Sequence, residues 1–223
     1  MQKIDACIVL GSQDVPEERR ALAELAEGGF PFCLVNQRFG GESYETVDAD
    51  HRSGSKQAVQ HLIKQGNRHI AFVNGPAQYS NSADRLLGYK SALEEAGINY
   101  SEELVYAGNY SRKSGQELAE PIAMRIQEGS IDAIFSANDR MAIGLMQRLH
   151  MLGLEAGKDY ALVGYDDSDG SRIINPRLST VAVPFYEMGR LAAARLLDAD
   201  EMKTTATDSV TLLPVSFIHR ETS

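Results

Sequence analysis

Residues 133–167, AIFSANDRMAIGLMQRLHMLGLEAGKDYALVGYDD, contain one pattern twice. The apolar run AIFS is followed almost at once by Asn138, and the apolar run ALVG is followed by Tyr165 and Asp166. Between these runs a helical pattern begins at Asn138, a natural N-cap residue, and stops before Gly153. A strand, a helix and a second strand in this order favour a parallel α/β sheet.

The same event occurs at three other places, where an apolar run ends and polar side chains follow. The five runs are 33–35 before Asn36, 70–73 before Asn74, 104–107 before Asn109 and Tyr110, 133–136 before Asn138, and 161–164 before Tyr165, Asp166 and Asp167. In an open α/β sheet the carboxyl ends of the parallel strands share one rim, and small ligands bind at that rim. The pattern therefore predicts a ligand-binding cleft.

Helical patterns alternate with these runs, and glycines close most of them. They span residues 16–27, 52–65, 82–96, 111–128, 138–152 and 184–198, after a first strand at 5–10. Residues 200–209 are polar and threonine-rich, which predicts a surface loop, and residues 210–219 are predicted to be extended. The alternation predicts an α/β fold in which helices cover both faces of a parallel sheet.

The composition excludes several classes of protein. The 223 residues carry 22 Lys+Arg against 31 Asp+Glu, a formal net charge of −9, so the chain by itself is predicted to bind DNA poorly. No apolar run approaches the ~20 residues of a membrane helix. The start of the sequence has no signal-peptide pattern, and Cys7 and Cys33 lie in apolar runs, so we expect reduced thiols and a cytoplasmic location.

The sequence offers little support for catalysis. It contains no GxGxxG after a strand, no Walker motif and no GxSxG elbow. Its five histidines show no metal-ligand spacing, and the acidic run at 166–169 lacks the terminal glutamate of an EF-hand. The polar residues at the predicted rim can bind hydroxyl groups but include no activated nucleophile. We therefore expect a binding protein without enzymatic activity, cofactor or metal.

Four stretches and the tail resemble the effector-binding region of the lactose-repressor/galactose-repressor family of bacterial transcription regulators. They are HLIKQGNRHIAFVNGP at 61–76, DRLLGYKSALEEAGI at 84–98, the stretch at 133–167, PRLSTVAVPFYEMGRLAA at 176–193 and LLPVSFIHR at 212–220. One such motif alone would be weak evidence for the family. The whole set is specific, because the stretches occur in the right order and together cover most of the chain.

The resemblance implies a periplasmic-binding-protein-like fold, with two Rossmann-type subdomains and an effector cleft between them. The first subdomain would hold residues 1–48 and 182–212, and the second would hold 49–181 and 213–223. The family also implies a homodimer that contacts DNA through a helix-turn-helix headpiece. The sequence departs from the family at its amino end, where neither the headpiece nor the first two βα units are recognisable. We therefore expect a truncated first subdomain with exposed apolar surface.

The resemblance and side-chain chemistry together predict seven ligand-binding residues: Arg85, Asn138, Asp166, Tyr110, Asn36, Phe185 and Asn81. The Arg85 guanidinium can donate two parallel hydrogen bonds to adjacent hydroxyls. Asn138 offers a donor and an acceptor, and Asp166 can accept from two hydroxyls. The simpler alternatives are a solvated helix arginine and a pure N-cap.

The other predicted residues have alternatives of their own. Tyr110 and Phe185 can either face a sugar ring or pack in a core. Asn36 stands where the family usually has an aspartate, and Asn81 lies one turn before Arg85. At the start of the helix predicted over 52–65, Asp50 and His51 are expected to cap it, and Asp167 is expected to support its loop.

Three functions follow from this reading. The first is the effector-binding and dimerisation core of a transcription regulator that responds to a sugar or sugar derivative, with a purine or nucleoside as the alternative ligand. The second is a sugar-binding protein of a transport system, which the absent signal-peptide pattern disfavours. The third is a Rossmann-type enzyme, which the missing phosphate-binding loop disfavours.

Overall fold

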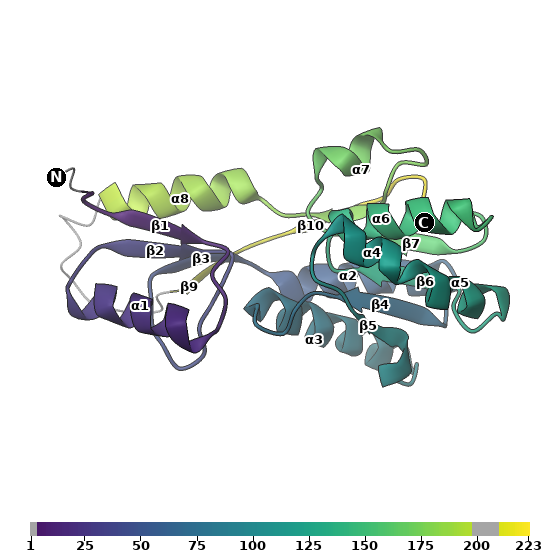
Figure 1. Cartoon of the computed structure of the whole chain (residues 1–223), viewed down its shortest axis with the longest axis horizontal. Coiled ribbons are helices and arrows are strands. Elements are labelled where there is room, and N and C mark those ends of the chain that lie inside the picture. Colours follow the sequence, from purple (N-terminus) through teal and green to yellow (C-terminus); the bar gives the residue numbers. More distant parts are fainter. Residues whose placement is uncertain (1–3, 198–209) are drawn as a thin grey trace. The chain divides into compact units, whose positions relative to one another are not determined.

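The computed structural model describes residues 4–197 and 210–223 and divides the chain into two compact units (Figure 1). Unit 1 contains Met1–Asp50, Ala77–Asn81 and Pro184–Pro214. Unit 2 contains His51–Pro76, Ser82–Val183 and Val215–Ser223. The predicted loop at 200–209 and the last residue of the helix predicted over 184–198 lie outside the described residues.

Unit 1 is built on a four-stranded parallel sheet in the order β1-β2-β3-β9. Leu22 packs against Leu34 and Phe39 on the face covered by α1, and α8 lies against β2 and β3 on the other side (Figure 1). Pro16 suits the first position of α1, where no intrahelical N–H is needed. The elements are β1 Cys7–Leu10, α1 Pro16–Glu27, β2 Phe32–Val35, β3 Thr46–Ala49, α8 Phe185–Leu197 and β9 Val210–Leu213.

Apolar side chains remain exposed in unit 1. β1 forms one edge of the sheet, and its Ile8 and Leu10 are 44% and 69% exposed. On α8, Tyr186 and Leu197 are exposed as well. Large apolar side chains in such positions commonly meet another surface.

Unit 2 contains a second parallel sheet in the order β5-β4-β6-β7 and a separate antiparallel pair, β10-β8. The central strands β4 and β6 are buried almost throughout, as expected for parallel strands covered on both faces. Phe72 and Phe135 stack across them with ring centroids 5.0 Å apart. The strands are β4 Ile70–Asn74, β5 Val105–Ala107, β6 Ala133–Ser136, β7 Ala161–Val163, β8 Thr180–Ala182 and β10 Ser216–Ile218.

The helices of this region correct one prediction. They are α2 His51–Lys64, α3 Ser80–Glu95, α4 Arg112–Glu117, α5 Ala119–Gln127, α6 Asp139–Met151 and α7 Asp169–Ile173, with a 3-10 turn, η1, at Glu102–Leu104. The single helix predicted over 111–128 is wrong, because the chain breaks between α4 and α5 at Leu118. Pro121 accounts for the break, since it has no N–H to donate to the carbonyl of Glu117.

The structure confirms the predicted α/β class with parallel sheets. In unit 2 the carboxyl ends of β4, β6 and β7 are followed by Gly75, Asn138 and Asp166. Across residues 4–197 and 210–223, no helix has the length and apolar character needed to cross a membrane.

Candidate functional site

The structure distributes the seven predicted ligand-binding residues over the two units. Unit 2 contains Arg85, Tyr110, Asn138 and Asp166. Arg85 lies close to both Asp166 and the Tyr110 ring, and Asn138 donates a hydrogen bond to the Tyr110 carbonyl. Asn36, Asn81 and Phe185 belong to unit 1. The two groups are therefore described separately.

Arg85 is a buried arginine on α3, and one of its guanidinium nitrogens, Nε, has no hydrogen-bond partner. Its side chain is 3% exposed, and Nη1 donates to the carbonyl oxygen of Ala137 at 2.5 Å. The guanidinium carbon lies 4.0 Å from the centre of the Tyr165 ring, a cation–π distance. Its Nε is buried and has no hydrogen-bond partner. Because an unsatisfied buried donor is costly, an additional acceptor at this N–H would stabilise the group.

Asp166 faces Arg85 at the end of β7. Its Oδ1 lies 3.8 Å from Nη2 of Arg85, and its side chain is 25% exposed. Burial is the largest influence on the pKa of Asp166 and raises it, the charge of Arg85 lowers it and Asp139 raises it, with a net pKa of about 7. Near neutral pH the Asp166 carboxyl is therefore divided between its two protonation states.

The guanidinium of Arg85 keeps its charge in this environment. Burial lowers its pKa, but the nearby Tyr110, Asp166 and Tyr165 more than offset that effect, so the pKa of Arg85 lies above its ordinary value. The site therefore combines a permanent cation with a carboxyl that can accept or donate a hydrogen bond.

Asn138 connects α6 to the loop that carries Tyr110. Its Oδ1 accepts from the backbone N–H of Met141 at 2.9 Å, which is the predicted N-cap, and its Nδ2 donates to the Tyr110 carbonyl at 3.0 Å. Tyr110 has φ 65°, and its hydroxyl lies 2.6 Å from Oγ of Ser82. A Cβ at Gly75 would lie 2.0 Å from Cζ of Tyr110, so only glycine leaves room for the ring.

Two residues that sequence reasoning did not select, His51 and Tyr165, complete the surroundings of Arg85. His51 is 1% exposed, and its Nδ1 lies 3.2 Å from Oη of Tyr165 and 3.3 Å from Nη2 of Arg85. A Cβ at Gly54 would lie 2.4 Å from the Tyr165 hydroxyl, so this glycine of α2 makes space for it. The sequence carried a signal for Tyr165, which is an aromatic residue directly before Asp166 at the end of a strand pattern.

Of the three predicted residues of unit 1, Asn36 directly follows β2, Asn81 is the second residue of α3, and Phe185 begins α8. Asn36 adopts φ 63°, and its carbonyl accepts from Nδ2 of Asn81 at 3.4 Å. Asn81 is 5% exposed. Phe185 is the first residue of α8 and is 44% exposed, so it does not fill a core.

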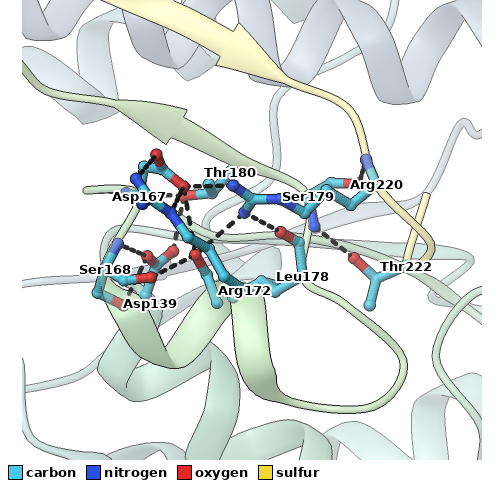
Figure 2. A network of polar contacts seen from close by, with 10 residues as sticks. Asp139, Asp167, Ser168, Arg172, Leu178, Ser179, Thr180, Arg220 and Thr222 are labelled. Atoms are coloured by element: carbon cyan, nitrogen blue, oxygen red, sulfur yellow. Dashed lines mark hydrogen bonds and ion pairs between the residues drawn. The ribbon is translucent and has the colours of Figure 1, made fainter.

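Two further carboxylates, Asp139 and Asp167, make their contacts within unit 2 (Figure 2). Asp139 is fully buried and accepts from the backbone N–H of Ser168 at 2.7 Å and from Oγ1 of Thr180 at 2.6 Å. Burial raises the pKa of Asp139 to about 6. Asp167 pairs with Arg172 and Arg220. These contacts fix the loop that presents Asp166.

The chemistry of the unit 2 group suits polar, uncharged ligand groups. In the described part of the chain, no cluster of three or more histidine, cysteine, aspartate or glutamate residues is arranged to hold a metal ion. A fixed cation, a carboxyl and tyrosine rings together can bind hydroxyl groups attached to a ring.

Residues 59–223 match the periplasmic binding protein-like domain family. The HTH-type transcriptional regulator CelR of Thermobifida fusca is 35% identical over 183 residues, which cover 81% of this chain and 53% of CelR. A solved structure of a CelR–cellobiose complex aligns with a TM-score of 0.89 and 31% identity, covering 99% of this chain and 66% of that chain.

A second solved structure, a LacI family transcriptional regulator from Enterococcus faecium with bound ribose, has a TM-score of 0.84 and 27% identity, covering 98% of this chain and 79% of that chain. The chain spans about half the length of the curated relatives it matches. The predicted resemblance is confirmed by these matches, and the chain belongs to the periplasmic-binding-protein-like effector domains of the LacI family of transcription regulators.

Proposed function

We propose that this chain is the effector-binding core of a LacI-family transcription regulator, and that Arg85 and Asp166 bind hydroxyl groups of a sugar. The observation that carries the proposal is the buried Arg85 guanidinium, whose Nε has no partner and whose Nη2 lies 3.8 Å from Asp166. A hydroxyl can accept a hydrogen bond from Nε and donate one to the Asp166 carboxylate at the same time. A vicinal diol can use both residues.

The charges in unit 2 favour a neutral sugar over a sugar acid or a sugar phosphate. The Arg85 guanidinium contacts a carbonyl, an imidazole, tyrosine rings and the Asp166 carboxyl. An anionic ligand would place a second negative charge beside Asp166, whose ionisation burial already opposes. The related CelR complex contains cellobiose and the related Enterococcus faecium regulator contains ribose, and both are neutral sugars.

Effector binding is proposed to control DNA binding elsewhere in the regulator. The relatives that this chain matches are HTH-type regulators, and the net charge of −9 makes this chain itself a poor partner for DNA. We assign the DNA contacts to a helix-turn-helix segment outside this chain, in a regulator that acts on DNA in the cytoplasm. Control then requires that the sugar bind two conformations with different affinity.

The regulator is further proposed to act as a homodimer. A groove of about 700 Å³ in unit 2 is lined by Ile143, Ile173 and Ile174 and by polar residues that include Arg112, Arg140 and Asp169. Ile173 is 84% exposed, and apolar surface surrounded by polar residues is typical of a contact with another protein. Sedimentation velocity tests the proposal: Ile173→Glu should dissociate the dimer, whereas Met124→Glu on α5 should leave it intact.

The alternative function is a sugar-binding protein of a transport system, which uses the same fold. The matched relatives are transcription regulators, which favours the regulator. Both functions require a sugar-binding site, so the residues of unit 2 are compatible with a regulator and with a transport protein alike.

Thermal melting against neutral sugars, sugar acids, sugar phosphates, purines and nucleosides tests the proposed ligand class. One class of neutral sugar should raise the melting temperature of the wild type and of Arg148→Met, a control in which an exposed ion pair with Glu120 is removed. Arg85→Met should weaken binding by roughly 10- to 100-fold, because hydrogen bonds to charged groups contribute about 1.5–3 kcal/mol. A nucleoside response, or full affinity in Arg85→Met, would contradict the proposal.

A further inference from the structure

Asp166 and Asp167 form a strained turn after β7. Their φ angles are 109° and 53°, in the left-handed region that residues with a Cβ rarely adopt. The backbone N–H of Asp166 donates to the carbonyl oxygen of Val181 at 2.8 Å, which ties the turn to β8. Two successive residues keep such angles only where their surroundings hold them. The groups that hold this turn therefore also fix the direction of the Asp166 carboxyl.

A partly buried arginine, Arg220, holds the turn through Asp167 (Figure 2). Its side chain is 13% exposed, and its Nη2 pairs with Oδ1 of Asp167. Its Nη1 donates to the carbonyl of Leu178 at 2.8 Å and to Oγ of Ser171 at 3.0 Å. The other oxygen of Asp167 accepts from Nη2 of Arg172 at 2.5 Å.

Asp167 stays ionised in this setting. Burial works to raise its pKa, but the hydrogen bonds from Arg172 and Arg220 prevail and hold the pKa of Asp167 below its ordinary value. Both arginines therefore act on a carboxylate, which makes their hydrogen bonds strong and directional.

The segment that carries Arg220 is itself anchored to the sheet. The Arg220 backbone N–H donates to Oγ of Ser179 at 2.9 Å. Thr222 is fully buried, and its hydroxyl donates to the carbonyl of Leu162 at 2.7 Å and accepts from the N–H of Ser179 at 2.9 Å. Leu162 belongs to β7, and Ser179 directly precedes β8. Arg220 is thus fixed to the two strands between which the Asp166 turn is held.

We propose that Arg220 is a positioning residue for effector binding: through Asp167 it holds the turn from which Asp166 reaches the ligand. The inference rests on the proposed function, because it takes Asp166 to contact the sugar. The Arg220 guanidinium is occupied by Asp167, Leu178 and Ser171 and acts on the ligand only through the turn. Its loss should lower affinity without removing any ligand contact.

Three variants and one control test this role. Arg220→Met keeps the apolar stem and removes the charge and the donors, whereas Arg220→Lys keeps the charge. Arg177→Met is the matched control, because Arg177 is 60% exposed and pairs with Glu221, the residue that follows Arg220. Asp167→Asn removes the same interaction from the other side.

Two measurements need no ligand: amide hydrogen exchange at Asp166 compared with β4, and the NMR titration of the Asp166 carboxyl. A third is calorimetric titration with the neutral sugar that most raises the melting temperature. In Arg220→Met, exchange at Asp166 should become at least about tenfold faster relative to β4, the Asp166 titration should move, and Kd should weaken by about tenfold. Arg220→Lys should recover part of each effect, and Arg177→Met should match the wild type.

A purely structural role would speed exchange in β4 as much as at Asp166 and would leave the Asp166 titration in place, which would overturn the inference. Unchanged exchange, titration and Kd in a folded Arg220→Met would overturn it as well. If Arg220→Met does not fold, Asp167→Asn and Arg220→Lys must show the same three effects. If the wild type binds no sugar, the proposed function fails, while exchange and titration still decide whether Arg220 holds the turn.

Discussion

Replacing Arg85 by methionine should shift the titration of Asp166 upward. Nη2 of Arg85 lies 3.8 Å from Oδ1 of Asp166. At that distance and an effective dielectric constant of about 20, two unit charges attract by about 4 kcal/mol, which corresponds to about three pH units in the titration of the carboxyl. The pKa of Asp166 is about 7 with Arg85 in place, and burial and Asp139 both act to raise it. Without Arg85, the influences of burial and Asp139, which both raise the pKa of Asp166, are no longer opposed.

Carbon-detected NMR of the aspartate side-chain carboxyl, followed from pH 4 to pH 10, measures this shift. Methionine keeps apolar volume over the Tyr165 ring, where the guanidinium carbon lies 4.0 Å from the ring centre. Removing one partner of a buried pair is costly when the other stays charged, and the Asp166 carboxyl avoids that cost by binding a proton. Arg148→Met is the control, since its ion pair with Glu120 is largely exposed. The functional consequence is that Asp166 stays protonated at neutral pH in Arg85→Met and can no longer accept from two hydroxyls.

The reasoning fails if Asp166 titrates in Arg85→Met at the same pH as in the wild type, or lower. Either result would mean that the Arg85 charge does not act on Asp166. A shift of the same size in Arg148→Met would show instead that the change in net charge, rather than the close pair, moves the titration.

Three other predictions concern the residues around this pair. Burial raises the pKa of Asp139 to about 6, so the protonated form stabilises the fold fully below pH ~4, and this stabilisation is lost as the pH rises to about 6. In urea unfolding, the free energy of unfolding should therefore fall by about 3 kcal/mol over this range in the wild type but not in Asp139→Asn. Asn138→Ala removes the α6 cap and the bond to Tyr110 and should cost about 1–2 kcal/mol in the same assay, with Asn138→Asp keeping the cap. Gly75→Ala would place its Cβ 2.0 Å from Cζ of Tyr110, so calorimetry should show weaker sugar binding; unchanged Kd would remove Tyr110 from the site.

Local patterns in the sequence were sufficient to predict most of the elements. The helix over 16–27 was predicted from Pro16 and the glycines that follow it, and the structure has α1 at Pro16–Glu27. The N-cap role of Asn138 was also readable, because it needs only a backbone N–H three residues away. These features depend on neighbours in sequence and therefore leave a local signal.

Other features depend on residues that are distant in the sequence. The Tyr165 ring beneath Arg85 and the contact of His51 with Tyr165, 114 residues apart, are set by the packing of separate helices and strands. Arg220 reaches Asp167 from 53 residues away. The break at Leu118 is different, since Pro121 was a local signal for it that the apolar periodicity of 111–128 obscured.

The most direct test of the proposed site is an NMR spectrum of the chain saturated with the neutral sugar that most raises its melting temperature. The account predicts that the Nε–H signal of Arg85 and the carboxyl signal of Asp166 shift most among the side chains of unit 2, because the sugar hydroxyls bind there. A sugar that binds with high affinity but leaves both signals unmoved would contradict the central claim.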